Sequence, residues 1–163
     1  MRIFAPLSYA PPDAPLIFLA GPIRGGGAWR QEATAILKRT DAGLCIASPA
    51  REGIIERLSE EDLRAQAEWE SHHLELAGYR GAILFWLPCQ REERSRGAYA
   101  QTTRIELGFW LAKIEDGAHL AIGAEEGFPG QRYIRYQVER AGLTLHPTLI
   151  NTCQEALILT HPA

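Results

Sequence analysis

The feature that most constrains the fold is a pair of short apolar runs, Leu16–Ala20 and Ala82–Leu87. A strand with one face in water would alternate apolar and polar residues, and neither run does. Such runs are typical of strands buried on both faces of a parallel sheet. Gly21-Pro22 ends the first run and Pro88 ends the second, because proline cannot donate to a sheet ladder.

Helical patterns separate these two strands from three further segments whose strand patterns are less pronounced. We expect strands over 16–20, 44–47, 82–87, 119–122 and 143–146, and helices over 29–39, 59–77, 103–115 and 131–141. Gly78 is expected to end the second helix, and Thr152 to cap a further C-terminal helix. Five alternations of strand and helix predict an α/β fold with a doubly wound parallel sheet, covered by helices on both faces.

The chain of 163 residues is long enough to bury a proper core and predicts one α/β domain over residues 16–163. No internal repeat or linker divides it. Residues 1–15 contain four prolines, at positions 6, 11, 12 and 15. This proline content predicts an irregular N-terminal arm or an edge segment.

The composition argues against several classes of protein. A net charge of -3 gives no basic field for nucleic acid, and no apolar run has the roughly 20 residues that cross a bilayer. Three scattered cysteines, without a CxxC pair, favour neither a disulfide framework nor a zinc site. His72 and His73 are adjacent, so they cannot readily share one metal from a helix face. We therefore expect a soluble, cytoplasmic protein with no metal and no cofactor.

Loops that follow strands should converge at one edge of such a sheet, where open α/β proteins bind ligands. They cover residues 21–29, 88–103 and, with less support, 48–53. The first contains Gly21, Pro22, Ile23 and Arg24, followed by three glycines. Its backbone N–H groups and the Arg24 fork suit an anion. The turn matches neither a Walker loop nor GxGxxG, so a flexible turn without a ligand fits it equally.

Glu106 follows the strongest predicted strand and lies near the start of the next expected helix. Thr103-Arg-Ile-Glu106 has the spacing of a capping box, in which the glutamate bonds back to the threonine N–H. The same position suits a nucleophile, because a helix N-terminus stabilises the ionised carboxylate. Both roles are open from spacing alone, and one residue can fill both.

Two further candidates come from the neighbouring segments. Glu68 and Glu70 are two residues apart on the expected helix 59–77, so at most one of them points at the sheet edge. Glu70 is the candidate acid, with a solvated surface residue as the alternative. Trp86 lies in the strand beside the expected site. It is a candidate to stack on a flat ring, although tryptophan is more often a core residue.

Four blocks together resemble the nucleoside 2-deoxyribosyltransferase family, especially its bacterial deoxyribosyltransferase-like branch. They are Ile17-Phe-Leu-Ala-Gly-Pro-Ile23 followed by Trp29, Gln66-Ala-Glu-Trp-Glu70, Ile83-Leu-Phe-Trp-Leu-Pro88, and Thr102-Thr-Arg-Ile-Glu-Leu-Gly108. Their order and spacing over roughly residues 16–160 are more specific than any one block. The Ile-Arg-Gly-Gly run is also similar to the turn that holds the nucleotide in 2′-deoxynucleoside 5′-phosphate N-hydrolases.

The resemblance implies a flavodoxin-like sheet and cleavage of an N-glycosidic bond in a small nucleoside or nucleotide. Glu106 occupies the position of the glutamate that attacks the anomeric carbon, and Glu70 that of an assisting acid. Gly21, Pro22, Ile23, Arg24, Trp86, Thr102 and Thr103 are the expected substrate contacts. The resemblance also implies a homodimer or a higher homo-oligomer in which a neighbour completes each site.

The chain departs from the transferases in one loop. They commonly carry an aspartate shortly before the glutamate, whereas residues 98–103 read Ala-Tyr-Ala-Gln-Thr-Thr. Three activities therefore remain open. They are sugar transfer between bases, hydrolysis of a deoxynucleoside 5′-monophosphate, and nucleotide binding without catalysis.

Overall fold

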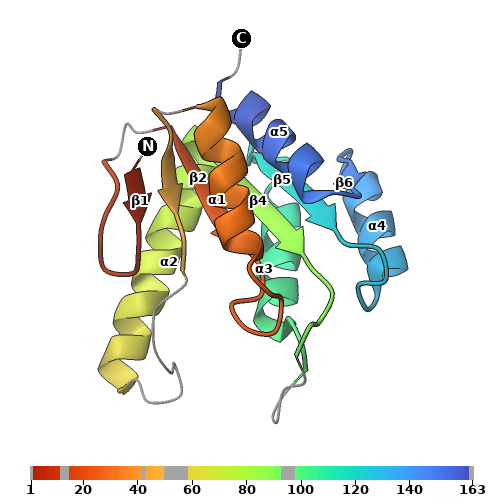
Figure 1. Ribbon diagram of the computed structural model, residues 1–163, viewed down its shortest axis with the longest axis horizontal. Coiled ribbons are helices and arrows are strands. Elements are labelled where there is room, and N and C mark those ends of the chain that lie inside the picture. The colour runs from red at the N-terminus through yellow and green to blue at the C-terminus, as the bar shows by residue number, and fades with distance from the viewer. Residues whose placement is uncertain (1, 12–14, 42, 50–58, 93–97, 162–163) are drawn as a thin grey trace.

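The computed structural model describes residues 2–11, 15–41, 43–49, 59–92 and 98–161. Within them one sheet is flanked by helices on both faces (Figure 1). Its strands are β1 (Arg2–Phe4), β2 (Leu16–Ala20), β3 (Cys45–Ala47), β4 (Ala82–Leu87), β5 (Leu120–Ala124) and β6 (Leu145–His146). The helices are α1 (Trp29–Thr40), α2 (Glu60–Arg80), α3 (Gln101–Leu111), α4 (Gln131–Arg140) and α5 (Leu149–Thr160).

The strand order is β1-β3-β2-β4-β5-β6, and each neighbouring pair runs parallel. Without β1, the remaining strands follow the flavodoxin-like order 2-1-3-4-5, so the predicted doubly wound fold is confirmed. The order reverses between β2 and β4. Ligands of this class of fold bind outside the carboxyl ends of the strands at that reversal.

The helices form two layers. Helices α1 and α5 share a core with Ile17, Leu19, Leu84 and Trp86, whereas α2, α3 and α4 pack in a second core on the other face. Figure 1 shows α1 and α5 in front of the sheet. Since alternate strand residues point to opposite faces, β2 and β4 need apolar residues at every position. Both strands are buried throughout.

The sheet has six strands within the described residues rather than five, because the expected N-terminal arm contributes β1 at the edge. Side chains of α2 anchor the segment that follows. Trp69 donates from Nε1 to the Ser8 carbonyl at 2.7 Å, and the Ala10 N–H donates to His73 Nε2 at 3.1 Å. His73 Nδ1 lies 2.8 Å from the Trp69 carbonyl, so the buried ring has a partner at both nitrogens.

The predicted end of α2 and the predicted start of α5 were wrong. Helix α2 continues past Gly78 to Arg80, and a Cβ at Gly78 would lie 2.6 Å from the Trp110 ring. That glycine therefore allows α2 and α3 to pack closely and does not end the helix. Helix α5 begins after Thr148, whose hydroxyl accepts from the Asn151 N–H, so Thr152 is an interior residue. Ser59 caps α2 as predicted, accepting from the Asp62 N–H.

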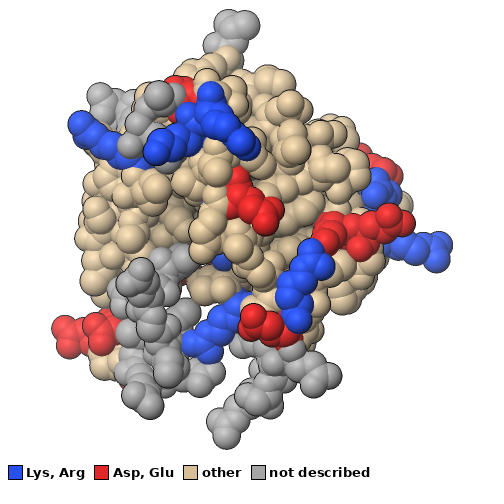
Figure 2. All heavy atoms as spheres, in the orientation of Figure 1, with Lys and Arg blue, Asp and Glu red and all other residues tan. Residues whose placement is uncertain are grey.

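Residues 50–53 of the loop expected over 48–53, and residues 93–97 of the loop expected over 88–103, lie outside the described residues. None of the helices that the structure describes combines the length and apolar character needed to cross a bilayer. On the face drawn in Figure 2, acidic and basic side chains lie in small groups of both signs. The described residues on that face therefore form no large field of one charge.

Candidate functional site

A cavity of about 460 Å³ opens at the carboxyl end of β2, on the face of the sheet that α2 and α3 cover. This is the edge at which the strand order reverses. Its walls include Phe18 and Ala20 of β2 and Pro49, which follows β3. Eight predicted site residues also line it: Gly21, Pro22, Ile23, Arg24, Glu70, Thr102, Thr103 and Glu106.

The turn after β2 forms one wall of the cavity, and side chains of α1 hold it in place. A Cβ at Gly21 would lie 2.5 Å from the Trp86 carbonyl oxygen, so only glycine fits where the turn crosses β4. The Pro22 carbonyl accepts from Trp29 Nε1 at 3.2 Å and from Arg30 Nη1 at 2.7 Å. Arg30 Nη2 donates to the Gly21 carbonyl at 2.6 Å. These bonds hold residues 21–27, which we call the glycine turn, against α1.

The start of α3 forms the opposite wall, and the predicted capping box is absent. The N-cap residue is Ala100, in the left-handed region at φ 56°, and no side chain caps the helix. Thr103 is buried inside the helix, and Glu106 lies in the second turn. The capping role predicted for Glu106 was therefore wrong. The helix dipole also favours it less than expected, because that effect fades beyond the first turn.

The carboxylate of Glu106 has a strongly perturbed pKa. Burial and the negative charge of Glu70 raise the pKa of Glu106 to about 7, against the attraction of Arg30. Within the described residues, no hydrogen bond or ion pair of Glu106 offsets this. A helix N-terminus was expected to stabilise the ionised carboxylate, whereas burial and Glu70 here favour the protonated form. At neutral pH both protonation states are populated, as in groups poised for acid–base or nucleophilic work.

Glu70 reaches the cavity from α2, whereas Glu68 is exposed on another face of that helix. Gln66, one turn earlier, donates from Nε2 to Glu70 Oε1 at 2.9 Å. The Gln66 side chain is buried, and its Oε1 has no partner among the described residues. This bond holds the Glu70 carboxylate at the cavity that Glu106 also lines.

Trp86 does not line the cavity. In β4 it belongs with Ala82 and Leu84, which face α1 and α5, whereas Glu70 and Glu106 approach from the other face. The pleat of the strand therefore turns Trp86 away. Its predicted role as a ring-stacking contact was wrong. Its backbone carbonyl instead packs against Gly21.

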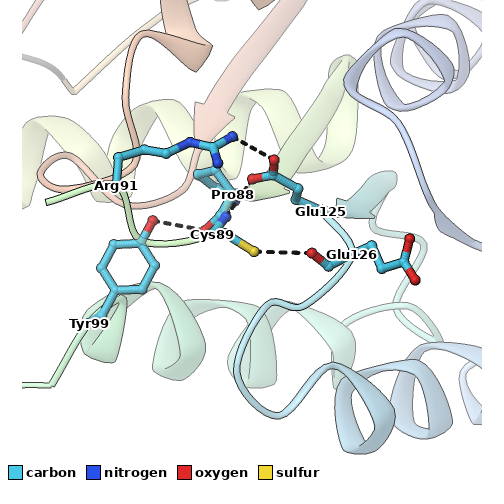
Figure 3. Close-up of polar contacts among 6 residues, drawn as sticks. All are labelled: Pro88, Cys89, Arg91, Tyr99, Glu125 and Glu126. Atoms are coloured by element: carbon cyan, nitrogen blue, oxygen red, sulfur yellow. Dashed lines mark hydrogen bonds and ion pairs between the residues drawn. The ribbon is translucent and has the colours of Figure 1, made fainter.

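A cluster of polar contacts connects the loops after β4 and β5 (Figure 3). Glu125 accepts from the Cys89 N–H at 2.7 Å and from Arg91 Nη2 at 2.5 Å. The Tyr99 hydroxyl donates to the Pro88 carbonyl at 2.9 Å. The Arg91 N–H also donates to the Gly25 carbonyl at 2.6 Å. The cluster thereby ties the glycine turn to the segment that leads into α3.

Sequence patterns did not identify Arg30, Gln66 or Tyr99 as part of this site. One signal for Arg30 was present, since a cation in the first turn of a helix opposes the helix dipole. Gln66 precedes Glu70 by four residues, the spacing of a side-chain hydrogen bond on one helix face. Nothing local marks Tyr99. Among the described residues, no group of three or more His, Cys, Asp or Glu side chains is arranged to hold a metal ion.

Comparison with known proteins identifies a family whose model matches the chain. No curated protein is similar enough to the chain to be matched. A family model described as "nucleoside 2-deoxyribosyltransferase like" matches residues 14–125, which is more than half of the chain. The matched segment contains every described residue that lines the cavity. The chain therefore belongs to the nucleoside 2-deoxyribosyltransferase-like family.

Proposed function

We propose that the protein cleaves the N-glycosidic bond of a nucleoside or nucleotide through a covalent bond between the sugar and Glu106. One observation carries the proposal: carboxylates from two helices, Glu70 and Glu106, face one cavity at the edge where this fold binds ligands. Glu106 also lies in the Glu-Leu-Gly block of the family resemblance. A nucleoside or nucleotide as the small-molecule substrate fits the family.

The chemistry proceeds in two displacements. An ionised oxygen of Glu106 attacks the anomeric carbon as the bond to the base breaks, and the electron pair of that bond leaves on the base nitrogen. The base nitrogen takes a proton from an acid or from water. A second base or a water molecule then attacks the anomeric carbon and releases Glu106 as a carboxylate. The acceptor decides between transfer and hydrolysis.

Glu70 assists in this proposal from the α2 side of the cavity. Its negative charge next to Glu106 stabilises the positive charge that develops on the sugar ring. The Gln66 bond holds that carboxylate in place while the substrate is present. Thr102 and Thr103 lie on the same wall as Glu106 and are proposed contacts of the sugar.

The first experiment is chromatography after incubation with a panel of nucleosides and nucleotides, with and without an acceptor base. Glu106→Gln should lower turnover by at least about 1,000-fold, since an amide is a poor nucleophile. Glu68→Gln is the matched control, because Glu68 is exposed on α2 and should leave activity unchanged. A folded Glu106→Gln protein with full activity would contradict the proposal. Binding without any product in the wild-type protein would favour a non-catalytic module.

A deoxynucleoside 5′-monophosphate hydrolase is the second candidate, and the position of Arg24 favours it. Arg24 lines the cavity beside the glycine turn, where a forked cation suits a phosphate. Arg24→Ala should then raise KM for nucleotides about tenfold or more and change KM for nucleosides little. Equal effects on both substrates would count against this candidate. The homodimer expected from the resemblance remains a prediction, which light scattering in solution can test.

A further inference from the structure

Gln66 is a buried amide at the cavity, and one end of it is unused. The residue comes from α2, is 7% exposed and lines the cavity together with Glu70 and Glu106. Its Nε2 donates to Glu70 Oε1 at 2.9 Å. Its Oε1 is closed to solvent and has no hydrogen-bond partner among the described residues. Buried polar atoms are nearly always paired, because an unpaired one costs free energy. The Gln66 oxygen therefore calls for a donor from outside the described part of the chain.

The contact with Glu70 decides which end of the amide is unused. If the amide were turned over, its carbonyl oxygen would meet an oxygen of the Glu70 carboxylate, and both are acceptors. An ionised Glu70 therefore keeps Nε2 toward itself and leaves Oε1 for a donor. A hydroxyl or an N–H can supply that proton, whereas a fully ionised phosphate has none to donate. Arg24, on the same cavity, is the side chain that suits an anion.

The Gln66 oxygen is covered in the resting structure, so a donor reaches it only when the amide turns. The last torsion of a glutamine is broad, without three narrow wells, so a modest turn toward the cavity costs little. A hydrogen bond formed there lies in a place that water does not reach. Such a bond is stronger than the same bond at an exposed site. The position therefore suits the recognition of one particular substrate group.

The stereochemistry of the proposed reaction indicates which group that is. Glu106 attacks the anomeric carbon in line with the breaking bond, and therefore from the side opposite the base. In a β-nucleoside, that face of the sugar also carries the 2′ and 3′ hydroxyls, whereas the base and C5′ lie on the other face. Glu70 and Gln66 come from α2, which covers the same face of the sheet as α3. Ring hydroxyls are thus the donors on the side of the sugar that meets these residues.

We propose that Gln66 is a specificity-determining contact, whose side-chain carbonyl accepts a hydrogen bond from the 2′ or 3′ hydroxyl of the substrate sugar. This inference rests on the proposed function, because the in-line attack by Glu106 fixes the face of the sugar. A substrate that carries the hydroxyl satisfies the buried carbonyl. An analogue without it leaves the carbonyl unpaired, and sites of this kind discriminate strongly against such analogues. The two ends of one amide then contact the Glu70 carboxylate and the substrate.

The test is isothermal titration calorimetry in the Glu106→Gln background, where binding is measured without turnover. The probes are adenosine, guanosine, cytidine and uridine, as nucleosides and as 5′-monophosphates, with their 2′-deoxy, 3′-deoxy and 2′,3′-dideoxy analogues. Gln66→Met keeps the length of the side chain and removes both polar ends of the amide. It should raise Kd for hydroxyl-bearing probes about tenfold or more, and leave Kd for the dideoxy probes unchanged. Removing the hydroxyl and removing the amide break the same contact, so the two losses should not add.

The matched control is Gln154→Met, since Gln154 is exposed on α5 in the other helical layer. It should leave every Kd unchanged. A role confined to holding Glu70 predicts that Gln66→Met weakens all probes by the same factor, dideoxy analogues included. That result would overturn the proposal, and so would a loss that follows the base instead of the sugar. Failure to bind any probe at millimolar concentration would overturn it as well.

A second measurement applies even if Gln66→Met folds poorly. In Glu106→Gln with Gln66 intact, the carbon-13 NMR signal of the Gln66 side-chain carbonyl, assigned through the chain, should shift on saturation with a hydroxyl-bearing probe. The matching dideoxy probe should leave the signal in place, and equal shifts with both would contradict the proposal. The proposed function fails separately, if Glu106→Gln still releases the base at the wild-type rate. An inactive Glu106→Gln protein whose Gln66 signal ignores the sugar hydroxyls would sink only the role of Gln66.

Discussion

Two glutamates lie at the carboxyl edge of the sheet in opposite circumstances. Glu125, directly after β5, accepts from the Cys89 N–H through Oε2 and from Arg91 through Oε1. Glu106 in α3 is partly buried, has no hydrogen bond within the described residues, and faces Glu70 across the cavity. The first carboxylate has a partner at each oxygen. The second is held beside a like charge.

This difference distinguishes a carboxylate with a structural role from one that is a candidate for the reaction. A carboxylate with a hydrogen bond at each oxygen stabilises the fold through charge-assisted bonds, and those bonds lower the reactivity of its oxygens. A carboxylate without partners, beside another carboxylate, costs stability in the folded state and remains available to a substrate. Sites of this kind are commonly destabilised relative to an apolar or neutral replacement. Glu125 therefore belongs to the scaffold and Glu106 to the candidate chemistry.

The largest expected effect is a stability change of opposite sign at the two glutamates. The folded pKa of Glu106, about 7, lies above its ordinary 4.5. The folded protein therefore binds more protons between these values, and stability falls as the pH rises through them. Glu106→Gln removes that loss and should stabilise the protein by up to about 3 kcal/mol at pH 8, with little change near pH 4.

Glu125→Gln should instead destabilise the protein by about 1–2 kcal/mol, because it loses charge-assisted bonds. Urea unfolding of both variants and the wild type at the two pH values measures the contrast. If Glu106→Gln is destabilised at pH 8, the carboxylate has stabilising partners and the contrast between the two sites is lost.

The second prediction concerns Glu70 as the source of the like charge. Removing that charge in Glu70→Gln should lower the pKa of Glu106, although burial keeps it above the ordinary value. The acidic limb of kcat/KM, which reports on the free enzyme, should therefore move down by about one pH unit. The maximum value of kcat/KM is expected to drop as well. The pH at which the acidic limb falls is therefore the informative quantity. Glu68→Gln should not move it, and an unmoved limb in Glu70→Gln would show that burial alone perturbs Glu106.

Patterns within the sequence were sufficient to predict the parallel sheet and to predict that its loops converge at one edge. β2 and β4 are predictable because a fully apolar run has few alternatives to burial on both faces. Once the strands alternate with helices, the loops after β2 and β4 must meet at one edge. The residues on those loops, Arg24 and Thr102 among them, then meet at the cavity without any knowledge of side-chain packing.

Local patterns failed where distant contacts decide between alternatives. A glycine at position 78 is typical of a helix C-terminus, but here the absence of a side chain leaves room for the Trp110 ring. Thr103 and Glu106 have capping-box spacing, but the left-handed Ala100 starts the helix two residues earlier than expected. Arg30 was not predicted because it comes from the opposite helical layer and reaches the site across the sheet edge. No spacing rule connects it to Glu106.

The smallest expected effect tests what holds Glu125 in place. Arg91 and Glu125 have side chains that are 54% and 31% exposed, and ion pairs this accessible contribute little. Arg91→Gln should therefore cost less stability than Glu125→Gln, and the cost should fade as salt screens the pair. The backbone bond from Arg91 to Gly25 survives the substitution, so the glycine turn keeps its tie. Urea unfolding at low and high salt measures both effects. If Arg91→Gln costs as much as Glu125→Gln, the ion pair rather than the Cys89 N–H bond dominates this contact, and the satisfied carboxylate depends on a surface charge.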